Sequence, residues 1–149
     1  MIGLHFRIDG NHYGLSCDEI VEIIPRIPLR PIVGAPEYVP GFFNYRGKVV
    51  PIVDISRLAA GKETAPLLSS RIAIVHYGAE RFLGLLLEDA TAIVELGAAP
   101  PVTQSTGVKT QVPYLDGIII AAGEAPLQML KTAELLPEEV RKTVFAEAV

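Results

Sequence analysis

The side chains that could do chemistry are few in this chain, and their spacing favours no reaction. His5, His12 and His76 occupy alternating, outward positions of apolar runs. His5 and His12 flank a turn and are expected to face each other across a hairpin. A zinc site needs more ligands than this pair, and no third residue has a suitable spacing. We therefore predict solvated strand residues rather than a metal centre.

The single cysteine and the neighbouring carboxylates also lack a catalytic setting. Cys17 precedes Asp18 and Glu19, whose negative charges raise the pKa of its thiol and make it a poor nucleophile. One cysteine excludes an internal disulfide. Glu88 and Asp89 are neighbours in a predicted strand, so they point to opposite faces and are not expected to share acid–base work.

Phosphate-binding patterns are missing too. No GxxxxGK[ST] or GxGxxG sequence follows a predicted strand. The sequence thus predicts a protein that is not an enzyme and that uses no cofactor and no metal. An enzyme with a shallow carboxylate site stays as a minor alternative.

Composition indicates the class of partner. The chain has 149 residues, of which 50% are hydrophobic and 20% charged, with a mean hydropathy of +0.36. No apolar run reaches the roughly 18 residues of a membrane helix, and no signal peptide is evident, so we expect a cytoplasmic protein without membrane insertion. A net charge of −4 argues against nucleic acid. The surplus of apolar residues predicts that some surface faces a partner protein.

Short apolar runs, separated by 13 glycines and 12 prolines, predict many short strands. Residues 4–8 alternate apolar and polar side chains, and Asp9-Gly10-Asn11 is a hairpin signal. The predicted strands lie at residues 4–8, 12–16, 42–43, 48–56, 71–77, 81–89 and 90–96, with two more within 114–130.

The connections between these runs indicate the domain organisation. Residues 16–24 predict a short helical turn, and the prolines of 24–41 predict an extended connection. Residues 57–70 are the most loop-like segment, and the end of the chain, 132–149, holds the only convincing helix. We predict an all-β fold with a short C-terminal helix that covers a barrel end. It forms one domain, residues 1–149, of two β-barrel lobes with a seam near 57–70.

One stretch, GFFNYRGKVVPIVDIS at residues 41–56, needs a further explanation. Asn44 and Gly47 suit the first and fourth positions of a type I turn. Pro51 lacks an N–H and predicts an edge or a bulge. Neither the turn nor Pro51 explains the arginine at position 46. Its guanidinium needs a carboxylate partner, and Glu22 and Asp54 are the candidates.

The same stretch carries a family pattern. Residues 36–54 read P-x-Y-V-x-G-x-x-N-x-R-G-x-V-V-P-I-x-D, which resembles the core signature of CheW-like domains, the bacterial chemotaxis coupling proteins. YGL at 13–15, IVEII at 20–24 and FLGLLLEDATAIVEL at 82–96 look like further family segments. The resemblance covers nearly the whole chain and is looser in the second half. GFFNYRG and LLSSRIAIV look closer to coupling proteins of Wsp-type surface-sensing pathways.

This resemblance implies a fold and a role. The fold is two intertwined five-stranded SH3-like β-barrels. The role is a non-catalytic scaffold that binds the regulatory domain of a CheA-type histidine kinase, itself similar in fold, and the cytoplasmic hairpin tip of methyl-accepting chemoreceptors. Such a protein is cytoplasmic and recruited to membrane-associated receptor arrays. An adaptor of a Wsp-type or pilus-motility pathway is the alternative within the family.

A β-barrel that binds small ligands or oligonucleotides is the alternative of another class. It needs aromatic platforms and a basic groove, which the lack of tryptophan and the net charge of −4 disfavour. The resemblance to CheW-like domains implies that Glu22 and Arg46 form a pair near the receptor-facing surface. Ile20 and Val49 are apolar contacts there or, alternatively, plain core. The predicted partner-binding residues are Ile20, Glu22, Asn44, Arg46, Gly47 and Val49.

Overall fold

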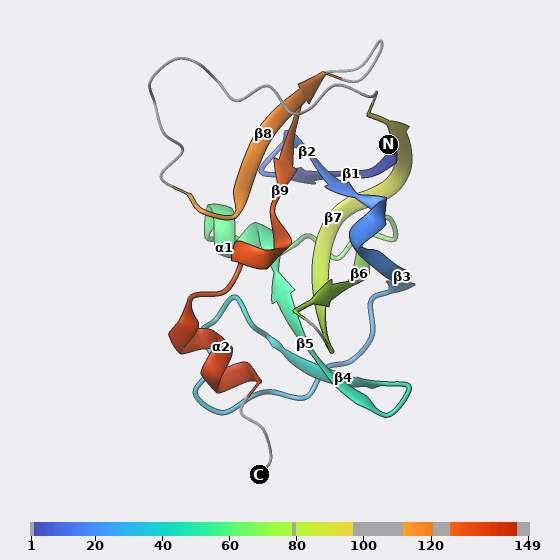
Figure 1. Ribbon diagram of the computed structural model, residues 1–149. Helices are drawn as coiled ribbons and strands as arrows, with labels where there is room; N and C mark the ends of the chain where they lie inside the picture. Colours follow the sequence, from blue (N-terminus) through green and yellow to red (C-terminus); the bar gives the residue numbers. More distant parts are fainter. Residues whose placement is uncertain (1, 79, 97–111, 121–125, 146–149) are drawn as a thin grey trace.

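The computed structural model describes residues 2–78, 80–96, 112–120 and 126–145 (Figure 1). The strands found there are β1 Ile2–Ile8, β2 Asn11–Ser16, β3 Ile20–Pro25, β4 Gly41–Tyr45, β5 Lys48–Asp54, β6 Arg71–Tyr77, β7 Arg81–Glu95, β8 Leu115–Ile120 and β9 Pro126–Leu130. The helices are α1 Ile55–Ala60 and α2 Glu138–Val144, and the 3-10 turns are η1 Cys17–Glu19 and η2 Thr132–Glu134.

Strand β7 belongs to two groups of five strands. Its first half pairs with β6 and β5, and its second half pairs with β1. One group is therefore β3, β4, β5, β6 and β7, and the other is β1, β2, β7, β8 and β9. Figure 1 shows the N-terminal and C-terminal hairpins together at one end of β7 and β4–β6 at the other. The predicted all-β, intertwined SH3-like architecture is confirmed, although hydrogen bonding between the described strands does not close either group into a barrel.

The hairpins form where the turn residues predict them. Asp9 and Gly10 both have positive φ, 49° and 81°, as a type I′ turn between β1 and β2 requires. The hairpin of β6 and β7 is confirmed as well, with Gly78 at φ 73°. In β1, Phe6 is fully buried and Arg7 is exposed, so the predicted alternation of faces holds.

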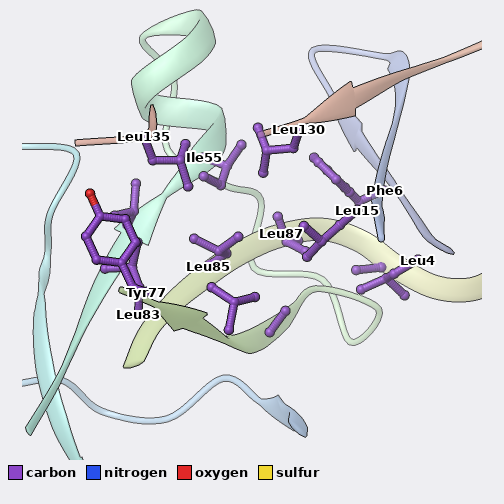
Figure 2. Packing of buried hydrophobic residues seen from close by; sticks show 14 of the residues in the cluster. Leu4, Phe6, Leu15, Ile55, Tyr77, Leu83, Leu85, Leu87, Leu130 and Leu135 are labelled. Carbon is purple, nitrogen blue, oxygen red and sulfur yellow. The ribbon is translucent and has the colours of Figure 1, made fainter. Parts of the chain in front are cut away.

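The main core lies between the two strand groups. Leu83, Leu85 and Leu87 of β7 are completely buried in one cluster with Leu4 and Phe6 of β1, among others (Figure 2). Burying one such side chain stabilises a fold by roughly 1.5–3 kcal/mol. A second cluster lies on the other face of β7, and it consists of Tyr45, Val50, Ile52, Ile72, Ile74 and Leu86. Because both faces of β7 are buried at residues 83–87, the sequence there is a continuous apolar run, LGLLL.

The helices differ in part from the prediction. The sequence predicted a loop from residue 57 and no helix before the C-terminal one, yet α1 spans Ile55–Ala60. Asp54 caps its first turn and Gly61, at φ 73°, ends it; the prediction missed this because Asp54 also ends a strand. The helical turn predicted at 16–24 forms only at η1. A seam near 57–70 stays a prediction.

The C-terminal helix covers one end of the main core. It was predicted within 132–149 and occupies Glu138–Val144; residues 146–149 lie outside the described residues. Val144 is buried, and the ring of the following Phe145 stacks on Tyr77 at 5.5 Å between centroids. This packing agrees with the predicted lid.

Asp54 ties three segments together. Its side chain is buried and accepts hydrogen bonds from the Arg57 N–H at 3.2 Å, the Thr64 N–H at 3.1 Å and the Thr64 hydroxyl. Its own N–H donates to the Tyr38 carbonyl at 2.7 Å. One carboxylate therefore holds the end of β5, the start of α1 and the loop that follows.

We expect Asp54→Ala to lower the free energy of unfolding by about 2–4 kcal/mol. A lost helix cap costs about 1 kcal/mol, and the buried donors of Thr64 left without an acceptor cost about 1–3 kcal/mol more. Urea denaturation measures the change. Glu63→Ala, an exposed neighbour, is the control and should stay within about 0.5 kcal/mol; equal effects of the two variants would contradict the assignment.

A hydrogen bond joins the connection between the two strand groups to the segment that follows the last strand. The Thr132 hydroxyl of η2 donates to a carboxylate oxygen of Glu19 in η1 at 3.0 Å. Burial raises the pKa of Glu19, and the charges of Asp116 and Asp18 raise it further, while the bond from Thr132 acts in the opposite direction. The ionised carboxylate thus carries a net penalty in the folded state.

A raised pKa in the fold means that the contribution of Glu19 to stability is present at low pH and is lost as the pH rises through the folded-state pKa. We therefore expect Glu19→Gln, which keeps an acceptor for Thr132, to gain stability relative to the wild type between about pH 4 and pH 7. Urea midpoints across this range test the sign. If the wild type became more stable relative to the variant as the pH rises, the expected sign would be wrong.

Candidate partner-binding site

The turn between β4 and β5 has a different geometry from the predicted one. Tyr45 and Lys48 pair directly, so Arg46 and Gly47 are the two central residues, with φ values of 51° and 84°. Two positive values indicate a type I′ turn, and the predicted type I turn is wrong. Asn44 still serves the backbone, because its Oδ1 accepts from the Gly47 N–H at 2.8 Å. Holding a non-glycine residue in this region costs roughly 1–2 kcal/mol.

Arg46 forms the predicted contact with Glu22. Its Nη2 lies 3.3 Å from the Glu22 Oε1, and the guanidinium lies 5.1 Å from the centre of the Tyr45 ring. The two side chains are 74% and 40% exposed, so the pair contributes only about 0–1 kcal/mol. Asp54, the other candidate, accepts from Thr64 instead. The ion pair therefore links β3 to the β4–β5 turn by an accessible contact.

The remaining predicted residues separate into two environments. Asn44 and Gly47 are exposed beside Arg46, and Val49, which is paired with Asn44 in register, is 61% exposed. Ile20 is half-buried, packs against the main core and pairs with Val75. Ile20 is therefore a core residue, the second of the two roles predicted for it, whereas Val49 is exposed and accessible to a partner.

A groove lies next to these residues, and its lining, apart from Asn44 and Val49, was not predicted. It has a volume of about 360 Å³ and is lined by Pro28, Arg30, Phe42, Phe43, Asn44 and Val49. The Arg30 N–H donates to the Phe42 carbonyl at 3.0 Å, and the Phe42 N–H donates to the Arg30 carbonyl at 2.8 Å. Gly41 permits this approach, because a Cβ there would lie 2.3 Å from the Arg30 oxygen. Gly41 in the family pattern was the signal that could have indicated the groove.

The two histidines of the first hairpin are half-buried and in contact, not fully solvated as predicted. His5 and His12 face each other, with Nε2 and Nδ1 2.7 Å apart. Within the described ranges no group of three or more potential metal ligands occurs. Burial, and then Asp18, raises the pKa of the Cys17 thiol, as predicted in direction.

The two adjacent carboxylates act separately, as predicted. Glu88 accepts from the Ala65 N–H at 3.0 Å, and Asp89 pairs with Arg7 at 3.5 Å. Among the helices of the described part of the chain, none is both long and apolar enough to cross a membrane.

Two SH3-like strand groups around a shared strand, with an exposed signature turn, define a class of double-lobed β-protein. Within that class, a model of the CheW-like domain matches residues 3–140, and the chain belongs to the CheW-like family. The crystal structure of the scaffolding protein TtCheW from Thermoanaerobacter tengcongensis has the same fold, with a TM-score of 0.75 and 22% identity, over 93% of this chain and 89% of that one.

Curated relatives carry chemotaxis names. The chemotaxis protein CheW of Rhizobium meliloti (strain 1021) is 33% identical over 60% of this chain and 57% of its own length. That of Klebsiella aerogenes is 25% identical over 91% and 81%. Protein PilI of Pseudomonas aeruginosa is 28% identical over 58% and 48%. The chain thus spans little more than half of the first relative and about four fifths of the second.

Two substitutions separate the strain of the turn from the ion pair. Arg46→Gly and Arg46→Ala both remove the contact with Glu22, but only glycine adopts the positive φ without steric cost. We expect the glycine variant to be more stable than the alanine variant by about 1 kcal/mol, and close to the wild type. Urea denaturation of the three proteins tests this. Equal stability of the two variants would refute the conformational argument.

Proposed function

We propose that this protein is a non-catalytic scaffold that couples methyl-accepting chemoreceptors to a CheA-type histidine kinase. Its place is the cytoplasm, at membrane-associated receptor arrays. Membership of the CheW-like family supports the scaffold role. The exposed Glu22–Arg46 pair, on the turn that carries the family pattern, is the observation that carries the proposal.

The physical properties of this pair suit recognition better than stability. An exposed ion pair stabilises the fold little, yet Arg46 is held in a strained conformation to make it. Accessible charges orient a partner and exclude wrong ones. Val49, exposed next to the turn, supplies apolar area for the same contact. Glu22, Asn44, Arg46, Gly47 and Val49 are the residues that we assign to partner binding, with Ile20 supporting them from the core.

An adaptor in a pilus-motility or surface-sensing pathway is the second candidate. The similarity to protein PilI, at 28% identity, favours it. The two candidates share the binding chemistry and differ in the receptor and kinase. Binding assays with kinase and receptor pairs from the flagellar and the pilus gene clusters of the same genome separate them.

The test is receptor-dependent autophosphorylation of the kinase with purified receptor and this protein. The wild type should stimulate phosphorylation, and Arg46→Gly and Glu22→Ala should weaken binding of receptor or kinase at least about tenfold, or 1.4 kcal/mol. The control is Lys62→Ala, because Lys62 and Asp9 form an equally exposed ion pair, 3.4 Å apart, on another surface. A wild type that binds neither partner would defeat the proposal.

A further inference from the structure

Strand β4 has an open edge at a single residue. On one side, β4 pairs with β5 along Gly41–Tyr45. On the other side, Phe42 exchanges both backbone hydrogen bonds with Arg30. Residues two apart in a strand direct their N–H and C=O to the same side, so the backbone of Asn44 points the way that Phe42 does. No described residue hydrogen-bonds to the Asn44 backbone there.

The open edge lies in the groove described above. Pro28 and Arg30 cover the first part of the edge, which is how natural proteins protect such strands. Beyond them, Asn44 and the 61% exposed Val49 line the part that stays open. The groove of about 360 Å³ has room for an added chain at this point.

The charges around the edge indicate what the groove accepts. Arg30 is exposed and makes no ion pair with a described carboxylate; within the described ranges it bonds through its backbone, to Phe42. Lys48 lies over the Phe82 ring, 4.8 Å from its centre, and is also unpaired among the described residues. These cations favour an acidic segment. A second copy is disfavoured, because pairing two β4 edges about Asn44 brings the Arg30, Arg46 and Lys48 side chains of both copies together.

We propose that the β4 edge at Asn44 accepts an extended strand of the kinase, with a carboxylate on Arg30 and an apolar side chain on Val49. Main-chain bonds of this kind give affinity, and the flanking side chains give specificity. The inference rests on the proposed function. Of the two proposed partners, the receptor tip is a helical hairpin, so the β-rich regulatory domain of the kinase is the one that offers a strand.

Two variants of one residue test the backbone contact. Asn44→Pro removes the edge N–H without touching the β4–β5 ladder, since that N–H points away from β5. Asn44→Ala is the matched control, because both variants lose the bond from Oδ1 to Gly47 and only proline loses the donor. Titration calorimetry with the kinase regulatory domain should show that the proline variant binds at least about tenfold more weakly than the alanine variant, because the two differ in the backbone donor and share the loss of the side chain.

Hydrogen exchange on the wild type gives a second measurement that needs no variant. The Asn44 amide should exchange fast in the free protein and slow at least about tenfold when the kinase domain is added. Arg30→Glu should weaken the complex at least about tenfold, whereas Lys62→Glu, a charge reversal on another surface, should not.

The outcomes distinguish this inference from the proposed function. A kinase complex that is insensitive to Asn44→Pro and leaves the Asn44 amide unprotected overturns strand addition and leaves the scaffold role standing. Protection by the receptor hairpin instead of the kinase overturns the choice of partner. If neither protein binds, the function and the inference both fail. Should Asn44→Pro not fold, the exchange experiment decides alone.

Discussion

Burial of the first half of β7, residues 83–87, on both faces is the constraint on which the rest of the structure depends. Leu83, Leu85 and Leu87 face the core shared with β1, and Leu86 faces the cluster under β4 and β5. One strand therefore lies between β6 and β5 in one five-stranded group and pairs with β1 at the edge of the other. A polar side chain at any of these positions would leave an unpaired polar group between packed layers, which costs several kcal/mol. The two strand groups therefore share buried side chains of one strand.

The candidate site lies at the far end of this rigid frame, where stability matters least. The ion pair between Glu22 and Arg46 is exposed, and the groove beside it is bounded by Arg30 and Val49. The buried strands hold the residues of the site in place. Because β5 pairs with β7, the turn that carries Arg46 is held at a fixed place relative to β3. Binding at such a preformed surface loses little conformational entropy.

Much of the fold could be predicted, since strands and hairpins depend on neighbouring residues. Asp9-Gly10 at the first turn and the apolar run of β7 have local physical causes. The helix α1 was missed because a capping aspartate and a strand-ending aspartate look alike in sequence. The turn at Arg46 was misassigned because its register depends on the pairing of Tyr45 with Lys48. The Glu22 contact was predicted from the family pattern, whereas the approach of Arg30 that lines the groove was not predicted.

By itself, the sequence determined the all-β class, the turns with glycine, the family and the carboxylate partner of Arg46. Only the tertiary structure decided that the N-terminal hairpin joins the C-terminal one, that Arg30 runs beside Phe42, and that Asn44 faces an open edge. The physical reason is the distance along the chain over which each determinant acts. Side-chain alternation and positive φ act over a few residues, whereas pairing between distant segments depends on which apolar faces bury each other when the whole chain packs.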